Sequence, residues 1–195
     1  MAPTVTRLRH ERPGWVAVDL DGSRWRVLPA EVVLRAGLTA GVELGRERAA
    51  TVARERRRVL ALGAAGNALA HRELTRVELD ERLRRRRLAP RDREAALDAA
   101  RRAGLQDDGR AARARAGSLA ARGYGNLAIE ADLRQRGVDG AIVDAAIGEL
   151  ESEAVRAARI VDRRGGSART AQALARRGFA QEAIELVVAD EADYG

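Results

Sequence analysis

The most distinctive chemical feature of the sequence is a run of four consecutive arginines, Arg84–Arg87. Guanidinium groups stay protonated and bind phosphate or carboxylate oxygens through paired hydrogen bonds. Further arginines lie close by in the sequence, so the run predicts a basic surface that contacts nucleic-acid phosphate or an acidic protein partner. The candidate contact residues are Arg82, Arg84, Arg85, Arg86, Arg87, Arg91, Arg93, Arg101 and Arg102.

The same run has a structural interpretation, because arginines in the last turn of a helix complement the negative end of the helix dipole. All 36 basic residues are arginine, which with the abundant alanine and glycine is typical of GC-rich coding, so their number alone says little. Their position says more, since residues 51–107 hold 15 arginines against nine acidic residues. A local basic surface of this kind attracts phosphate. From the residues, both interpretations stay open.

Residue types for catalysis or metal binding are scarce. The sequence contains no cysteine and two histidines, His10 and His71, far apart in the chain. It has no Gly-rich phosphate loop, no nucleophile elbow and no spacing typical of metal ligands. The acidic pair Asp107–Asp108 is better explained as the start of a helix. We therefore expect no catalytic residues, no cofactor and no metal, in a protein that is not an enzyme.

The elements that must position the arginines follow a repeated pattern of leucine, three residues, glycine and an apolar residue. The pattern occurs at 133–138 and 174–179, and in a degenerate form at 83–88. Its period of about 45 residues is typical of a repeated supersecondary unit. The residues that we assign to these repeat junctions are Leu83, Leu133, Gly137, Val138, Leu174, Gly178 and Phe179.

Each copy of the pattern is typical of the end of a helix. The leucine lies on the buried face of the last turn, and the arginines after it face the carbonyl end of the helix dipole. Glycine then takes the left-handed position that other residues resist, and the apolar residue folds back onto the helix. A single copy would be compatible with any helix-turn-helix junction, but three copies in matching order favour a true repeat.

The N-terminal part of the chain is the one region that favours β-structure. Asp21–Gly22 is a strong two-residue hairpin turn inside the segment 15–28. We expect a third strand over 4–9 or packing on the next helix, because a lone hairpin is marginally stable. A short helix should follow from Pro29 to Arg35 and end at Gly37. The expected strand pairs are Leu20 with Ser23, Val18 with Trp25 and Val16 with Val27, with Trp25 in the core.

The remainder of the chain favours helix almost throughout, since it is rich in Ala, Leu, Arg and Glu. A helix over 46–70 could bend at Gly63 and Gly66, and Thr75 with Glu78 forms a capping box. The last helix should end near Ala189, before a frayed acidic tail over 190–195.

We predict a mainly α protein in which three tandem three-helix repeats form an elongated, curved body behind a small β-hairpin and helix extension. The predicted parts are the extension over 1–50, repeat 1 over 51–106, repeat 2 over 107–150, and repeat 3 with the acidic tail over 151–195.

The order and spacing of these residues resemble the RecX family over residues 55–190. Two departures stand out, since Arg87 replaces the usual glycine of repeat 1 and Ala111–Ala112 stand where an aromatic residue often follows the Asp motif. The hairpin and short helix resemble an extension found in some members. The matching residues are Thr75, Glu78, Leu79 and Leu83 in repeat 1; Leu105–Asp108, Gly125, Ile129, Leu133, Gly137, Val138, Ile142 and Ile147 in repeat 2; and Leu174, Arg177, Gly178, Phe179 and Ile184 in repeat 3.

The resemblance implies that the protein binds RecA–DNA filaments along their groove and inhibits ATP hydrolysis, strand exchange and coprotease activity. It would thereby modulate recombination and the SOS response, meeting single- or double-stranded DNA directly or through RecA. No apolar run approaches the roughly 20 residues of a membrane span, and the first twelve residues are polar, so we expect a cytoplasmic monomer. Two alternatives remain: a helical protein that binds DNA directly without RecA, and a helical adaptor for another protein.

Replacement of Gly137 or Gly178 by valine should lower the free energy of unfolding by roughly 1 kcal/mol or more, because a β-branched residue resists the left-handed conformation. Thermal unfolding of the two variants tests this. An unchanged melting temperature for both would contradict the proposed helix end.

Overall fold

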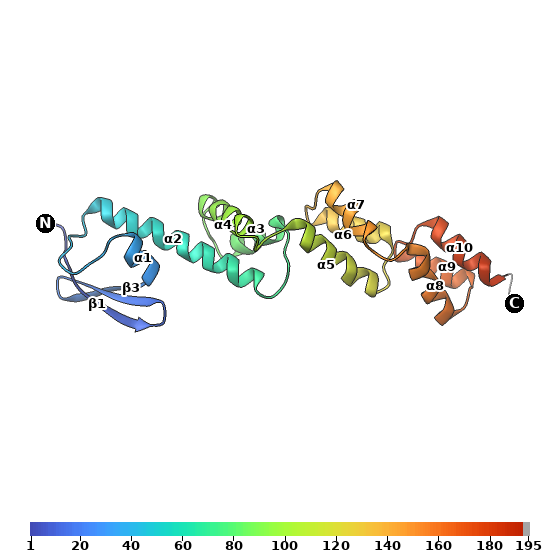
Figure 1. The fold of residues 1–195 in the computed structure, drawn as a ribbon, viewed down its shortest axis with the longest axis horizontal. Helices are drawn as coiled ribbons and strands as arrows, with labels where there is room; N and C mark the ends of the chain where they lie inside the picture. The colour runs from blue at the N-terminus through green and yellow to red at the C-terminus, as the bar shows by residue number, and fades with distance from the viewer. Residues whose placement is uncertain (193–195) are drawn as a thin grey trace. The chain divides into compact units, whose positions relative to one another are not determined.

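The computed structural model describes residues 1–192 and divides into two compact units, residues 1–68 with 82–103, and residues 69–81 with those from 104 onward. The described residues form three strands followed by ten helices (Figure 1), which confirms the mainly α prediction with a small N-terminal β element. The strands are β1 (Val5–Arg12), β2 (Trp15–Leu20) and β3 (Ser23–Pro29). The helices are α1 (Ala30–Arg35), α2 (Arg46–Leu69), α3 (Arg76–Arg85), α4 (Pro90–Arg102), α5 (Asp108–Ala121), α6 (Asn126–Gln135), α7 (Gly140–Gly148), α8 (Glu153–Arg164), α9 (Ala168–Arg176) and α10 (Gln181–Ala192).

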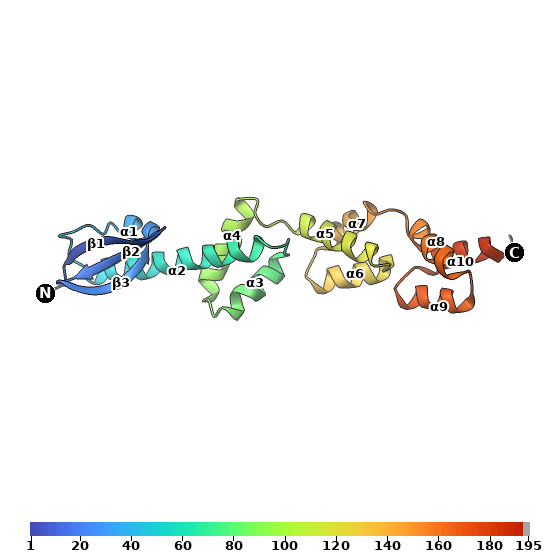
Figure 2. The ribbon, with the colours of Figure 1, turned by 90° about the horizontal axis from the view of Figure 1, so that it is seen from below.

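The three strands form an antiparallel sheet in the order β1-β2-β3, which Figure 2 shows side by side. Asp21 and Gly22 both take positive φ angles, 47° and 82°, as the predicted two-residue turn requires. The expected third strand is also present as β1. The N-terminal prediction of a hairpin, an added strand and a short helix is therefore confirmed.

The predicted hairpin register holds next to the turn and is wrong from Val18 onward. Leu20 pairs with Ser23 as expected, but a bulge leaves Trp25 without a partner, so Val18 pairs with Arg26 and Val16 with Leu28. One extra residue on β3 shifts every later pair by one position. Leu28 is consequently fully buried in the place expected for Val27, while Trp25 is partly buried against the same core.

Helix α2 contributes to the core beneath the sheet. Its Val52 is buried in one cluster with Val5, Val18 and Val32 from the sheet and α1. The helix is continuous through Gly63 and Gly66, so neither glycine ends it. The first turns of α2 thus stabilise the sheet that a hairpin alone could not maintain, and the predicted boundary at residue 50 falls inside this helix.

The predicted helix-end pattern has the same hydrogen bonds in all three copies. The N–H groups of Leu88, Val138 and Phe179 donate to the leucine carbonyl five residues earlier, at 3.5, 3.2 and 3.2 Å. Gly137 and Gly178 have φ angles of 73° and 77°. Arg87 takes the same left-handed conformation, with a φ of 58°, so the departure in repeat 1 changes the residue and not the turn. Helix α5 ends in the same way at Gly123 and Tyr124, so the pattern identifies a helix end rather than one position in the repeat.

Repeats 2 and 3 each have a hydrophobic core of their own. Helices α5, α6 and α7 bury Ile129, Leu133 and Val143 in one cluster, and α8, α9 and α10 bury Val161, Leu174 and Phe179 in another. The capping box of α3 is present, since Thr75 Oγ1 accepts from the Glu78 N–H and Glu78 Oε2 accepts from the Thr75 N–H, both at 3.1 Å.

The end of the last helix differs from the prediction. Helix α10 continues through Ala192, so residues 190–192 are helical and not a frayed tail. No glycine or proline interrupts this stretch, and its alanine and glutamate residues favour helix. The rest of the predicted tail, residues 193–195, lies outside the described residues. In the part of the chain that is described, no helix combines the length and the apolar character that a membrane crossing requires.

The second helix of each later repeat is joined at its C-terminal end to the repeat before it. The Arg136 carbonyl at the end of α6 accepts a hydrogen bond from Thr75 Oγ1 at 2.9 Å. At the end of α9, the carbonyls of Arg177 and Gly178 accept from the N–H groups of Gly125 at 2.9 Å and Leu127 at 3.0 Å. Helix ends leave carbonyls without partners, and these contacts satisfy them at the ends of α6 and α9. At the second junction they also satisfy N–H groups at the start of α6.

The first helix of each later repeat completes the same junction. Asp108 accepts from the Arg76 N–H at 2.7 Å, and Glu153 accepts from the Asn126 N–H at 2.5 Å. An acidic residue in the first turn of α5 or α8 thus caps the second helix of the preceding repeat. The Leu74 carbonyl accepts from Gln106 at 3.4 Å, and the corresponding Tyr124 carbonyl accepts from Arg156 at 2.8 Å. Corresponding positions of the two junctions are thus joined by hydrogen bonds, although the side chains that make them differ.

Gly125 allows the backbones of repeats 2 and 3 to approach closely. A Cβ atom on Gly125 would lie 2.2 Å from the carbonyl oxygen of Gly178 and 2.2 Å from the nitrogen of Phe179. A Cβ atom on Gly178 would lie 2.6 Å from the nitrogen of Ala128. These distances are far inside van der Waals contact, so no side chain fits unless the junction opens.

Replacement of Gly125 by alanine should therefore lower the free energy of unfolding by at least about 2 kcal/mol, through overpacking of backbone against backbone. The matched control is Gly63→Ala, at an exposed position of α2 with nothing within 4 Å of the added atom. That change should raise stability by about 0.5–1 kcal/mol, because alanine favours helix. Chemical denaturation of both variants is the measurement, and equal effects of the two changes would contradict the close approach.

Candidate functional site

The nine predicted contact arginines lie together in chain order on the end of α3, the following loop and α4, all within one compact unit. Eight of them are exposed. Arg93 is only partly exposed, and its Nη1 donates to the Leu88 carbonyl at 3.2 Å, so it has a structural role. Arg86 and Arg87 are exposed and make no ion pair with any described residue, so their guanidinium groups are available to a ligand.

Some of the predicted arginines line a cavity of about 440 Å³ between α2 and α4. Arg91 and Arg102 contribute from α4, opposite three arginines of α2 that the sequence analysis did not select. The lining arginines are Arg54, Arg57, Arg58, Arg91 and Arg102. Asp92 and Asp98 also line the cavity, and Asp92 pairs with Arg57 at 3.5 Å.

The α2 arginines were missed because they lie 26 to 30 residues before the start of the run at Arg84. Only the packing of α2 beside α4 brings them near Arg91. A helical signal for them existed, since Arg54 and Arg58 are four residues apart and share one face of the expected helix. The cavity therefore carries more positive than negative charge and enlarges the predicted basic surface with residues from a second helix.

Other arginines are used inside the fold. Asp132 on α6 accepts from Arg115 Nε at 2.9 Å and Nη2 at 2.7 Å, and from Arg136 Nε at 2.6 Å. Arg136 also pairs with Glu78, the residue that caps α3. This network connects α3, α5 and α6 and leaves its arginines without free charge for a ligand.

The network lowers the pKa of Asp132 far below its ordinary value. The largest cause is the hydrogen bonding from Arg115. Burial is the second-largest effect and raises the pKa, and the hydrogen bonds and charge of Arg136 lower it further. The same contacts raise the pKa of the Arg115 and Arg136 guanidinium groups. Side-chain exposures of 23% for Asp132 and 29% for Arg115 place the pair in a partly desolvated environment, where the interaction is stronger than on the surface.

The described residues contain no group of three or more histidine, cysteine or acidic side chains arranged to hold a metal ion.

Comparison with known proteins agrees with the resemblance found in the sequence. A family model described as "RecX, second three-helix domain" matches residues 107–147, which include α5, α6 and nearly all of α7. The regulatory protein RecX of Halorhodospira halophila (strain DSM 244 / SL1) is 37% identical over 142 residues, covering 67% of this chain and 88% of the relative. The chain belongs to the RecX family.

Further RecX proteins and structures support this assignment. The regulatory protein RecX of Xanthomonas axonopodis pv. citri (strain 306) is 36% identical over 126 residues, which are 60% of this chain and 78% of that protein. A crystal structure of regulatory protein RecX has the same fold, with a TM-score of 0.78 at 20% identity over 95% of this chain and 98% of the other. RecX from Lactobacillus salivarius gives a TM-score of 0.62 at 17% identity, over 70% and 97% of the two chains. The RecX resemblance and the mainly helical fold are therefore both confirmed.

The Asp132 network makes stability depend on pH in a defined direction. The folded-state pKa lies below the unfolded value of about 4, so the carboxylate stabilises the fold above that pH and loses this effect as the pH falls below it. Asp132→Asn should therefore cost about 2 kcal/mol at pH 7, where it removes the carboxylate that Arg115 and Arg136 share, and much less near pH 2.

Denaturant unfolding of this RecX protein and the variant at both pH values measures the difference. The control is Glu130→Gln on the same helix, whose exposed pair with Arg134 should contribute under about 0.5 kcal/mol at either pH. A cost for Asp132→Asn that is equal at pH 7 and pH 2 would contradict the assigned role.

Proposed function

We propose that this protein is a regulator that binds RecA–DNA filaments and inhibits the ATP hydrolysis, strand exchange and coprotease activity of RecA. It would thereby moderate recombination and the SOS response. The observation that carries this proposal is the 37% identity to a regulatory protein RecX over 88% of that relative's length. The role is that of a binding protein and not an enzyme, acting as a monomer in the cytoplasm.

The basic surface of α3 and α4 supports a contact with the filament. A RecA–DNA filament offers phosphates and acidic side chains, both of which arginine forks bind. Arg86 and Arg87 follow α3 in an exposed turn. The left-handed conformation of Arg87 sets the direction in which the chain leaves α3. The arginines of α2 beside Arg91 and Arg102 would widen this contact.

Three repeats in tandem would give several contact points on a polymeric partner. Each contact can be weak, because a first contact raises the effective concentration of the others. Binding should then depend on filament assembly, since only an assembled filament offers many protomers at fixed spacing. The proposed partition into an extension and three repeats suits this mode of binding.

The second candidate is a helical protein that binds DNA directly, without RecA. Arg86 and Arg87, which make no ion pair with a described residue, favour this second function, because such groups bind backbone phosphate without sequence preference. The two functions differ in partner dependence, since direct binding requires no recombinase and weakens steeply with salt.

The decisive experiment is ATP hydrolysis by RecA on single-stranded DNA with this protein added at less than one copy per RecA. Strong inhibition at that ratio supports a filament regulator, because one bound copy then affects many protomers. Absence of inhibition together with intact binding to naked DNA favours the direct DNA-binding function.

The contact residues are tested by changing Arg84, Arg85, Arg86 and Arg87 to glutamine. We expect inhibition to need at least about tenfold more protein at physiological salt, which corresponds to about 1.4 kcal/mol of binding free energy. A matched control changes four exposed arginines elsewhere, Arg7, Arg46, Arg169 and Arg176, and removes the same charge. Undiminished inhibition by the first variant would show that the run is structural.

A further inference from the structure

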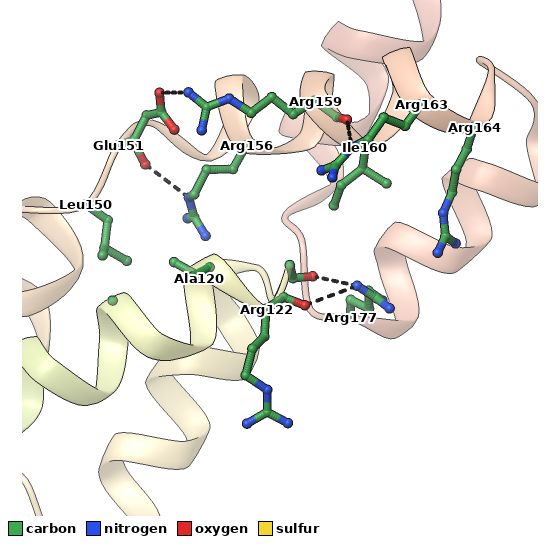
Figure 3. Close-up of a pocket in the computed structure, with 13 residues that line it drawn as sticks. Ala120, Arg122, Leu150, Glu151, Arg156, Arg159, Ile160, Arg163, Arg164 and Arg177 are labelled. Carbon is green, nitrogen blue, oxygen red and sulfur yellow. Dashed lines mark hydrogen bonds and ion pairs between the residues drawn. The ribbon is translucent and has the colours of Figure 1, made fainter. Parts of the chain in front are cut away.

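A second cavity, of about 600 Å³, lies where the end of α5, helix α8 and the end of α9 meet. Figure 3 shows the side chains that line it. Its position within one compact unit fixes these elements relative to one another through the junction between repeats 2 and 3. The arginines that line it are Arg122, Arg156, Arg159, Arg163, Arg164 and Arg177, and Glu151 is the one acidic residue among the described lining.

The net charge of repeat 3 does not indicate this basic cavity. The residues of repeat 3 carry slightly more negative than positive charge, so their composition did not predict a basic surface there. The fold collects four arginines from α8, one from the turn after α5 and one from the turn after α9. Positive charge is thus concentrated locally in a part of the chain that is close to neutral.

Two of the six arginines have structural roles. Arg156 is 8% exposed and donates to the carbonyls of Glu151 at 3.1 Å and Tyr124 at 2.8 Å, and to Asn126 Oδ1. Burial lowers the pKa of its guanidinium group. Arg159 pairs with the single carboxylate of the cavity, Glu151, at 2.6 Å. No other carboxylate of the described lining remains to neutralise the other four arginines.

Two of those four arginines, Arg163 and Arg177, are held in place by main-chain carbonyls, which carry no net charge. Arg163 Nε donates to the Arg159 carbonyl at 2.8 Å. Arg177 Nη1 donates to the carbonyls of Arg122 at 3.3 Å and Gly123 at 3.4 Å, which closes the end of α5. These bonds orient the guanidinium groups and leave other N–H donors on each of them.

The side chains of the remaining two arginines, Arg122 and Arg164, lie in different surroundings. Arg122 lies over the Tyr124 ring, 5.5 Å from its centre, and Figure 3 shows it pointing away from the other arginines. Arg164 is exposed in the last turn of α8 and makes no ion pair with a described residue. The cavity therefore presents Arg163, Arg164 and Arg177 together, with three positive charges that no carboxylate of the described lining pairs with.

We propose that this cavity binds the phosphodiester backbone of DNA, with Arg163, Arg164 and Arg177 as the contact residues. The backbone carries a charge on every nucleotide at regular spacing, so one strand can meet several arginines fixed on different helices. The donors that remain free are side-chain forks on rigid elements, which suits phosphate oxygens. The site lies in repeats 2 and 3 and requires no recombinase, so it goes beyond the proposed filament contact of repeat 1.

The test changes Arg163 and Arg164 to glutamine in the full chain and leaves Arg177 in place, because Arg177 also closes α5. The matched control is Arg169→Gln with Arg176→Gln, two exposed arginines of repeat 3 outside the cavity. Binding of a fluorescein-labelled single-stranded oligonucleotide is measured without RecA over a series of salt concentrations. Melting temperatures of both variants confirm that they are folded.

We expect the cavity variant to bind several-fold more weakly at about 0.1 M salt, and the slope of log K against log salt to fall by about 1–2. The control variant should change the slope by less than half of that amount. Equal slopes for the two variants would overturn the proposal, as would a failure of the unmodified protein to bind the oligonucleotide at low salt. Unchanged DNA binding with lost inhibition of RecA would also overturn it and would assign the cavity to an acidic protein surface.

Discussion

The contact between the end of one repeat's second helix and the start of the preceding repeat's second helix determines how consecutive repeats meet. The carbonyls of Arg136, Arg177 and Gly178 have no partner within their own helices and receive donors from Thr75, Gly125 and Leu127. An unsatisfied carbonyl buried at such a junction would cost about as much as a lost hydrogen bond. The junction therefore requires close backbone approach, which explains why glycine occupies position 125.

The junction also controls where positive charge can gather. At the junction of repeats 1 and 2, Glu78 and Asp132 neutralise Arg115 and Arg136, so that surface is occupied by its own ion pairs. At the junction of repeats 2 and 3, the arginines instead donate to main-chain carbonyls, which orient them without cancelling their charge. Two junctions between corresponding helices thus differ in the charge that they leave for a ligand.

The N-terminal sheet illustrates how a local feature alters a longer pattern. The Asp21–Gly22 turn sets the first pair of the hairpin, and the alternating apolar residues on both sides made the regular register a reasonable prediction. The bulge at Trp25 allows Leu28 to reach the core that Val32 and Val52 complete. Packing against helices outside the hairpin therefore overrides the regular pairing, which short-range patterns cannot anticipate.

The sequence by itself determined the helix ends, the caps and the family, because each depends on residues a few positions apart. Leu133 with Gly137, Leu174 with Gly178, and Thr75 with Glu78 are examples, and even Arg87 keeps the turn that its neighbours specify. The tertiary structure alone decided which arginines share a surface. Arg54 and Arg91 line one cavity from two helices, and Arg163 and Arg177 of repeat 3 line another together with Arg122 of repeat 2. The interaction between two charges depends on the distance between them, and packing between segments far apart in the chain sets that distance.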